Sequence, residues 1–231
     1  MQRQVAIITG AAAGLGLELA IRTCQRGFTV VGVSRRIPDE PRWEKLRAQG
    51  CAEHVSGDVA DVRSVEAAFE TATNRGELTA VFNCAGAGVF GPAGSYTRDD
   101  IDEALRGNLI GTIIFSDYAF RKFRTTGGVI VNVISTAAHI GRPNETVYCA
   151  SKWGARGYTE ALRAEAKGSS VRVIAIYPGG MNTRFWVEAR GSRTNPQNFM
   201  EPGDVAAYIL SVVDLRGIAY TSDLVINRMA T

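Results

Sequence analysis

The chain of 231 residues has few cysteines and histidines, and their spacing is not that of a metal site. It contains four cysteines without short paired spacing and two histidines that are far apart: Cys24, Cys51, Cys84 and Cys149, with His54 and His139. Structural zinc and disulfide frameworks need closely spaced sets of such residues. We therefore expect no metal site, and unpaired cysteines of this kind are typical of the reducing cytoplasm.

The chain also lacks runs of like charge and long apolar runs. Its formal net charge is only +3, whereas nucleic-acid-binding domains usually concentrate basic residues on one face. A membrane-spanning helix needs about 20 apolar residues in succession, and the N-terminus lacks the basic, apolar and small-residue layout of a signal peptide. We expect no nucleic-acid partner, no membrane partner and a cytoplasmic protein.

Short apolar runs rich in β-branched residues alternate with helical patterns along the chain. Such runs are typical of strands buried on both faces, and the alternation predicts a doubly wound parallel sheet with helices on both faces. With 45% hydrophobic residues, one domain over 1–231 is expected. Strands are predicted over 5–9, 28–34, 52–56, 78–83, 128–134, 170–177 and 223–226, and helices over 14–26, 41–49, 62–74, about 98–124, about 148–166 and 202–214.

A glycine-rich turn joins the first predicted strand to the first predicted helix. It has the form Thr9-Gly10-x3-Gly14-x-Gly16. Strand, glycine turn and helix form the context of a dinucleotide site, in which glycines allow close approach of the backbone to a pyrophosphate and the helix N-terminus offers free N–H groups. A purely structural turn is the other interpretation.

The end of the second predicted strand indicates which dinucleotide is bound. An NAD site usually has a carboxylate there, but this chain has Ser34-Arg35-Arg36 and no carboxylate before Asp39. A guanidinium can hold a 2′-phosphate through two hydrogen bonds. The pattern favours NADP(H), and the alternative is that both arginines are solvated loop residues.

Two further strand ends add candidate cofactor contacts. Asp58, followed by Val59, either caps the predicted helix 62–74 or accepts the adenine amino group, and the sequence leaves both open. Asn83, Ala85 and Gly86 end the fourth predicted strand, where small residues suit a wall against a flat ring.

Tyr148 and Lys152 are four positions apart in a predicted helix, so their side chains lie on one face. A free tyrosine titrates near pH 10, and a neighbouring cation favours the phenolate. The pair can then donate and accept a proton near neutral pH, which is what general acid–base catalysis requires. By itself the spacing also occurs by chance on solvated helices.

Together these motifs, in this order, resemble the short-chain dehydrogenase/reductase family. The resemblance extends over nearly the whole chain. It rests on the glycine turn at 9–16, Asn83-x-Ala85-Gly86, Asn108, Ser135, Tyr148-x3-Lys152 and Pro178-Gly179. It implies a Rossmann fold with a nicotinamide cofactor.

The resemblance also implies a role for each catalytic candidate. Tyr148 would exchange a proton with the substrate oxygen, and Ser135 would hydrogen-bond that oxygen. Lys152 would lower the pKa of Tyr148 and hold the nicotinamide ribose, while Asn108 would interrupt its helix and hold a water that connects Lys152 to solvent. Thr183 would contact the carboxamide. The complete set of expected cofactor contacts is Gly10, Ala13, Gly14, Leu15, Gly16, Ser34, Arg35, Arg36, Asp58, Val59, Asn83, Ala85, Gly86, Tyr148, Lys152, Pro178, Gly179 and Thr183.

The chain departs from the family pattern at two places. Cys84 stands where the family often has asparagine or alanine, and we expect no consequence. Ala11, Ala12 and Ala13 stand where many NADPH-using members have a basic residue, which leaves Arg35, with Ser34 or Arg36, to select NADP(H). The chain is short after its last predicted strand, so no C-terminal extension is expected to close the pocket.

These observations predict an NADPH-dependent carbonyl reductase or alcohol dehydrogenase for a small, partly apolar ketone or aldehyde. An NAD-dependent hydroxysteroid or alcohol dehydrogenase and a non-catalytic NADP-sensing protein are the alternatives. The substrate pocket is expected near Ser135, Thr136, His139, Tyr148, Gly180 and an irregular segment, 181–200, that suits a lid. His139 is expected to be a wall or surface residue rather than a second acid or base.

Self-association as a homodimer or homotetramer is predicted from the apolar helix stretch Leu109–Phe115. This stretch is apolar nearly all round, so it needs cover on more than its sheet-facing side. The predicted interface includes the Tyr148 helix and Trp153 or its neighbours.

Overall fold

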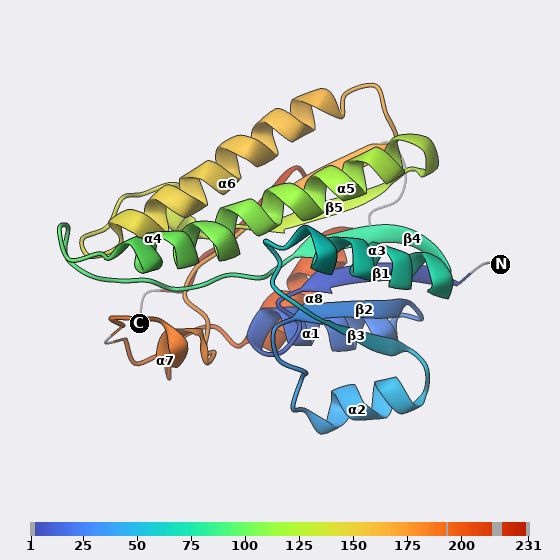
Figure 1. The fold of residues 1–231 in the computed structure, drawn as a ribbon, viewed down its shortest axis with the longest axis horizontal. Coiled ribbons are helices and arrows are strands. Elements are labelled where there is room, and N and C mark those ends of the chain that lie inside the picture. The colour runs from blue at the N-terminus through green and yellow to red at the C-terminus, as the bar shows by residue number, and fades with distance from the viewer. Residues whose placement is uncertain (1–2, 193, 214–218, 230–231) are drawn as a thin grey trace.

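Seven parallel strands form one sheet in the order β3-β2-β1-β4-β5-β6-β7 (Figure 1). The computed structural model describes residues 3–192, 194–213 and 219–229. The strands are β1 (Gln4–Thr9), β2 (Thr29–Ser34), β3 (Ala52–Ser56), β4 (Glu77–Asn83), β5 (Gly128–Val133), β6 (Val171–Pro178) and β7 (Asp223–Ile226). Chain order reverses between β1 and β4, which is where Rossmann folds bind their ligands.

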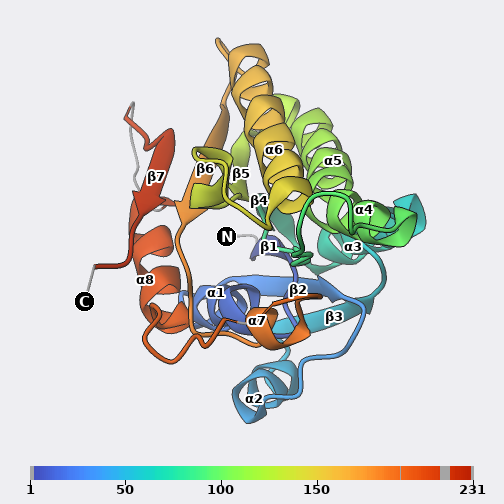
Figure 2. The ribbon, with the colours of Figure 1, turned by 90° about the vertical axis from the view of Figure 1, so that its left-hand side faces the viewer.

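Helices cover both faces of this sheet, as the sequence predicts (Figure 2). The strand β1 shows why, because alternate side chains enter opposite layers: Ala6 and Ile8 pack with α1, α2 and α8, whereas Val5 and Ile7 pack with α3, α5 and α6. The helical elements are α1 (Gly14–Gln25), α2 (Pro41–Ala48), α3 (Val62–Arg75), α4 (Arg98–Leu105), the π turn η1 (Arg106–Ile110), α5 (Gly111–Thr126), the 3₁₀ turn η2 (Thr136–Ala138), α6 (Thr146–Glu165), α7 (Phe185–Glu188) and α8 (Pro202–Val213).

The predicted helix 98–124 is broken in its middle by the π turn η1. Its start is confirmed: the Thr97 hydroxyl accepts from the Asp100 amide and the Asp100 carboxylate accepts from the Thr97 amide. The expected interruption lies around Asn108, whose side chain bonds to the backbone of Ala87. Such π turns often occur at functional sites.

The other predicted boundaries that fall on described residues are within two residues of the observed ones. The predicted helix end at 214 and residue 193 of the segment 181–200 lie outside the described residues. Among the helices that the structure describes, none has the length and apolar character needed to cross a membrane.

Candidate active site

A cavity of about 1060 Å³ opens at the carboxyl ends of the strands. Pockets for small ligands commonly measure about 300–1000 Å³, so this one has room for a dinucleotide and a substrate. Of the residues predicted from the sequence, those that line it are Gly10, Ala13, Gly14, Leu15, Gly16, Ser34, Arg35, Arg36, Asp58, Val59, Ala85, Gly86, Ser135, Thr136, Tyr148, Lys152, Pro178, Gly179, Gly180 and Thr183. Asn83, Asn108 and His139 do not.

The glycine turn lies on the floor of this cavity and has the shape that a pyrophosphate needs. Gly10 has φ +69°, and a Cβ there would lie 2.9 Å from the Ala85 backbone. A Cβ on Gly16 would lie 2.3 Å from the carbonyl oxygen of Gly10. No side chain caps α1, so its first N–H groups stay free for a phosphate. These residues fit a dinucleotide cofactor.

At the carboxyl end of β2, Arg35 and Arg36 line the cavity but differ in their partners. Arg36 Nη2 lies 2.8 Å from the Glu188 carboxylate, whereas the Arg35 guanidinium pairs with no carboxylate of the described residues. The Ser34 hydroxyl donates to the Arg36 carbonyl at 2.8 Å and lies 3.0 Å from His54 Nε2. The hydroxyl is therefore already used in shaping the turn.

The structure decides between the two interpretations of Asp58. The N-cap of α3 is Asp61, whose carboxylate accepts from the Arg63 amide, so the capping interpretation of Asp58 is wrong. Asp58 lines the cavity and accepts from the Ala60 amide and from Arg106. Burial raises the pKa of Asp58, but the Ala60 amide and Arg106 outweigh it and keep the pKa below its usual value.

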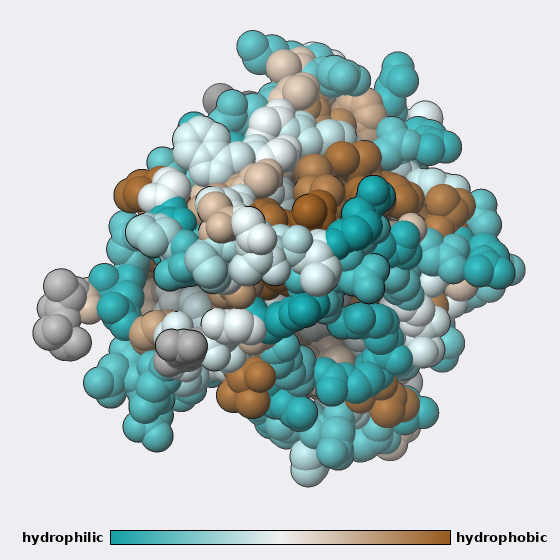
Figure 3. Space-filling model, turned by 60° about the vertical axis from the view of Figure 1, so that its left-hand side comes forward, coloured by the Kyte–Doolittle hydropathy of each residue, from teal (hydrophilic) through white to brown (hydrophobic). Residues whose placement is uncertain are grey.

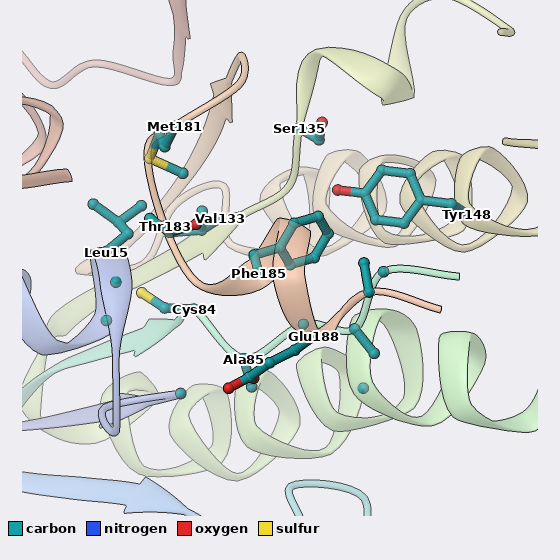
Figure 4. A pocket seen from close by; sticks show the side chains of 18 of the residues that line it. Leu15, Cys84, Ala85, Val133, Ser135, Tyr148, Met181, Thr183, Phe185 and Glu188 are labelled. Atoms are coloured by element: carbon teal, nitrogen blue, oxygen red, sulfur yellow. The ribbon is translucent and has the colours of Figure 1, made fainter. Parts of the chain in front are cut away.

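Tyr148 and Ser135, which the sequence predicts as catalytic residues, lie together in the cavity and are here called the candidate reactive centre. Figure 4 shows the Tyr148 hydroxyl directed toward Ser135, from α6 and from the end of β5 respectively. Tyr148 is 9% exposed, and burial raises its pKa to about 12, although the hydrogen bond with Ser135 lowers it. The phenol is therefore protonated throughout the neutral range.

Lys152 lies one helical turn from Tyr148, with Nζ 5.8 Å from the centroid of the Tyr148 ring. It is 5% exposed, and burial lowers its pKa to about 8. Desolvation of the phenolate is the largest effect on the Tyr148 pKa and raises it, and the lowering of that pKa by Lys152 stays a prediction. A Cβ on Gly86 would lie 3.6 Å from Nζ, so this glycine leaves space for the ammonium.

Asn108 does not line the cavity, but it is hydrogen-bonded to segments that carry cavity residues. It is 1% exposed, its Oδ1 accepts from the Ala87 amide at 3.0 Å, and its Nδ2 donates to Ser151 Oγ at 3.1 Å. Ser151 in turn donates to the Tyr148 carbonyl at 2.7 Å. Asn108 thus ties the segment that follows β4, at Ala87, to the helix that carries Tyr148.

Two residues predicted for the cavity lie elsewhere. The Asn83 side chain points into the interior and donates to Ser116 and Asn132, so it does not line the cavity. His139 is on the surface, its ring 4.4 Å from the Tyr177 ring and its Nδ1 2.9 Å from Arg156. Of the two placements expected for His139, the surface one is confirmed.

The structure adds aromatic residues that cover the candidate reactive centre. Phe90 and Phe185 contact the Tyr148 ring at centroid distances of 5.4 and 6.0 Å, and Trp186 stacks on Phe90 at 5.7 Å. The aromatic content of 181–200 indicated a lid, but Phe90 follows β4 and has no sequence signal. Arg142 and Glu145 also line this part of the cavity and likewise have none.

Burial of Lys152 predicts a pH-dependent cost in stability. Below pH 8 the folded protein carries a buried ammonium, whereas above 10.5 the lysine is neutral in both folded and unfolded states. We expect Lys152→Met to raise the free energy of unfolding at pH 7 by up to about 3 kcal/mol, and this gain to shrink as pH rises from 8 toward 10.5. Urea unfolding at several pH values measures it. The exposed Lys45→Met is the control, and a pH-independent difference contradicts the prediction.

Comparisons with known proteins agree with this geometry. The family model described as short chain dehydrogenase matches residues 4–193. The D-threitol dehydrogenase of Mycolicibacterium smegmatis is 32% identical over 97% of this chain and 91% of its own length. Human 17-beta-hydroxysteroid dehydrogenase type 1 is 32% identical over 90% of this chain and 65% of its own length.

A solved structure shows the same architecture along the chain. The crystal structure of a short-chain dehydrogenase/reductase from Vibrio parahaemolyticus is 30% identical, with a TM-score of 0.83 over 98% of this chain and 97% of its own. The matching family model, the relatives and the shared fold together place this chain in the short-chain dehydrogenase/reductase family of oxidoreductases.

Proposed function

We propose that this protein is a cytoplasmic, NADPH-dependent carbonyl reductase that runs in reverse as an alcohol dehydrogenase. Its substrate is a small, partly apolar ketone or aldehyde, and one domain over 1–231 carries both cofactor and substrate sites. The observation that supports this best is that Tyr148, Ser135 and Lys152 face the same cavity as the glycine turn. That arrangement brings a proton donor to the place where a bound nicotinamide would meet a carbonyl.

The residues of the site divide the chemistry between them. When bound, the nicotinamide supplies the hydride to the carbonyl carbon, or accepts it from the alcohol. Ser135 holds the carbonyl oxygen beside the Tyr148 hydroxyl, which donates the proton. A phenol with a pKa of about 12 is protonated at neutral pH, as the proton donor of the reductive direction must be. Phe90 and Phe185 exclude water from the reaction.

NADP(H) is proposed over NAD(H) because of the charge at the end of β2. Arg35 lines the cavity without a carboxylate partner among the described residues, and no carboxylate occurs between Ser34 and Asp39. The names of the relatives describe dehydrogenases of a polyol and of a steroid, which fits the dehydrogenase alternative in its reaction class and does not bear on the choice of NAD(H) or NADP(H). Those two substrates differ so much in polarity that they do not select one here.

A substrate panel tests the proposal. Purified protein is assayed with NADPH and with NADH against ketones, aldehydes, quinones and diketones, and with NADP⁺ against the matching alcohols. We expect NADPH-dependent reduction of at least one carbonyl class. Tight NADPH binding without turnover of any compound in either direction would favour the NADP-sensing alternative and overturn the enzyme.

The lid predicts a change in hydrogen exchange. Within the segment 181–200, Met181 forms a β-bridge with Met200 and Trp186 Nε1 donates to the Met181 carbonyl. Arg190 joins the segment to the rest of the chain, because its side chain pairs with Asp100 and its backbone bonds to Gly88 and Phe90. We expect the amides of this segment to exchange fastest without ligand, and to become protected when NADPH and a substrate analogue bind. Equally strong protection in both samples contradicts a gating role. The amides of β5 serve as the internal control.

A second prediction concerns self-association through α5 and α6. Ile110 is 38% exposed and Trp153 48% exposed, and Figure 3 shows hydrophobic side chains gathered in the upper part of the face it displays. We expect a homodimer or homotetramer by light scattering at micromolar concentration. Trp153→Glu should weaken self-association. The control Val62→Glu, at an exposed apolar position on α3, should leave self-association unchanged. A wild-type mass of only 24.8 kDa contradicts the prediction.

A further inference from the structure

The carboxylate of Glu188 lines the cavity beside two arginines, Arg36 and Arg184. Arg36 Nη2 is 2.8 Å from Glu188 Oε1, and Arg184 Nε is 3.4 Å from the same oxygen. Both arginines and Glu188 line the cavity. Arg36 follows β2, whereas Glu188 ends α7, so the contact joins segments that are 152 positions apart in the chain.

The short helix α7 therefore contributes to two parts of the cavity lining, one beside Tyr148 and one beside Arg36. At its start, the Phe185 ring contacts Tyr148, with a centroid distance of 6.0 Å. Figure 4 shows the Glu188 side chain leaving α7 in a different direction from Phe185.

The charge of Glu188 decides what Arg36 can bind. A guanidinium that already holds a carboxylate is a weaker partner for a phosphate, because the incoming anion must displace that carboxylate and is repelled by it. Arg35 is not restrained in this way among the described residues. The pair is also largely exposed, with side-chain exposures of 65% for Arg36 and 42% for Glu188. Exposed ion pairs add little stability, so a ligand can break this one easily.

We propose that Glu188 is a specificity-determining residue that competes with the 2′-phosphate of NADP(H) for Arg36. The inference rests on the proposed NADP(H) function and deepens it. Arg35 gives the chain its preference for a 2′-phosphate, and Glu188 limits that preference by holding Arg36. Binding of the 2′-phosphate separates Arg36 from Glu188, and reformation of that ion pair favours release of the cofactor.

The experiment measures binding of cofactor fragments to the full chain by calorimetry. Glu188→Gln keeps the size of the side chain and removes its charge. We expect it to bind 2′,5′-ADP about 5- to 20-fold more tightly than wild type, and 5′-AMP within about twofold, because only the former carries the 2′-phosphate. The gain should fall at high salt. NADPH affinity should follow 2′,5′-ADP.

Two further variants make the result specific. Glu201→Gln changes a carboxylate of the neighbouring segment whose partner is Asn182 rather than an arginine, and should alter neither affinity. In an Arg36→Met background, Glu188→Gln should no longer improve the ratio of 2′,5′-ADP to 5′-AMP affinity, because the contested guanidinium is gone.

Three results overturn the inference. If Glu188→Gln binds 2′,5′-ADP with the affinity of wild type, Glu188 does not compete with the 2′-phosphate. If its affinity rises equally for 5′-AMP and 2′,5′-ADP, the cause is a general effect of charge. A loss of 5′-AMP and NADH affinity shows that Glu188 accepts a hydrogen bond from the ribose 2′-hydroxyl. If wild type binds neither NADPH nor 2′,5′-ADP, the NADP(H) proposal fails as well, whereas an unchanged variant with a binding wild type refutes only this inference.

Discussion

Tyr148→Phe should lower the turnover number by at least about 100-fold and leave NADPH affinity nearly unchanged. The substitution removes the one hydroxyl that points at Ser135 and keeps the ring that packs between Phe90 and Phe185. General acid catalysis contributes about 10²–10⁴-fold, which sets the size of the loss. Steady-state kinetics gives the turnover number, and quenching of tryptophan fluorescence gives the dissociation constant of NADPH.

A matched deletion of a hydroxyl on the same helix controls for this result. Tyr158→Phe removes a hydroxyl that donates to the Ile113 carbonyl, away from the cavity, and should retain nearly full activity. Lys152→Ala should lose both turnover and NADPH affinity, since the ammonium lies beside both the Tyr148 ring and Gly86. Full activity in Tyr148→Phe would refute the assignment of Tyr148 as the proton donor.

Arg35→Asp should shift the ratio of kcat/KM for NADPH over NADH by about 100-fold or more toward NADH. A charge-assisted hydrogen bond is worth about 1.5–3 kcal/mol, and the new carboxylate also repels the 2′-phosphate and can accept from a ribose 2′-hydroxyl. Ser34 is left in place because its hydroxyl holds the turn through the Arg36 carbonyl. Wild type should prefer NADPH by well over tenfold.

The control for this change is Arg124→Asp, an equal change of charge on α5 that is outside the cavity. It should leave the ratio unaltered, which separates a local phosphate contact from the effect of net charge. An unchanged ratio in Arg35→Asp would move the phosphate site to another residue. A wild type that prefers NADH would support the NAD-dependent alternative.

The sequence predicts most of the fold because its signals are local. Strand ends, the glycine turn and the capping box at Thr97 each depend on a few neighbouring residues, and all are confirmed within two positions. The direction of a polar side chain at a strand end is not local. Asn83 pairs in register with Asn132, and both turn toward the interior rather than toward the cavity. No sequence pattern reports that register.

The sequence also could not predict the electrostatics of the site. The spacing of Tyr148 and Lys152 places a cation beside a phenol, but burial raises one pKa to about 12 and lowers the other to about 8. Desolvation depends on everything that surrounds a group, including Phe90 and Phe185 from distant segments. A pair of residues four apart carries no information about that enclosure.

By itself, then, the order of strands, helices and motifs determined the family, the fold and the candidate residues Ser135, Tyr148 and Lys152. Periodicity and glycine positions can be read from neighbouring residues, whereas the contacts of Phe90 and Phe185 with Tyr148 cannot. The tertiary structure decided that Asp61 rather than Asp58 caps α3, that His139 lies on the surface, and that Glu188 meets Arg36 across the cavity. These contacts join segments far apart in the chain. Their energies depend on distance and burial in the folded protein, and neither exists before the chain has folded.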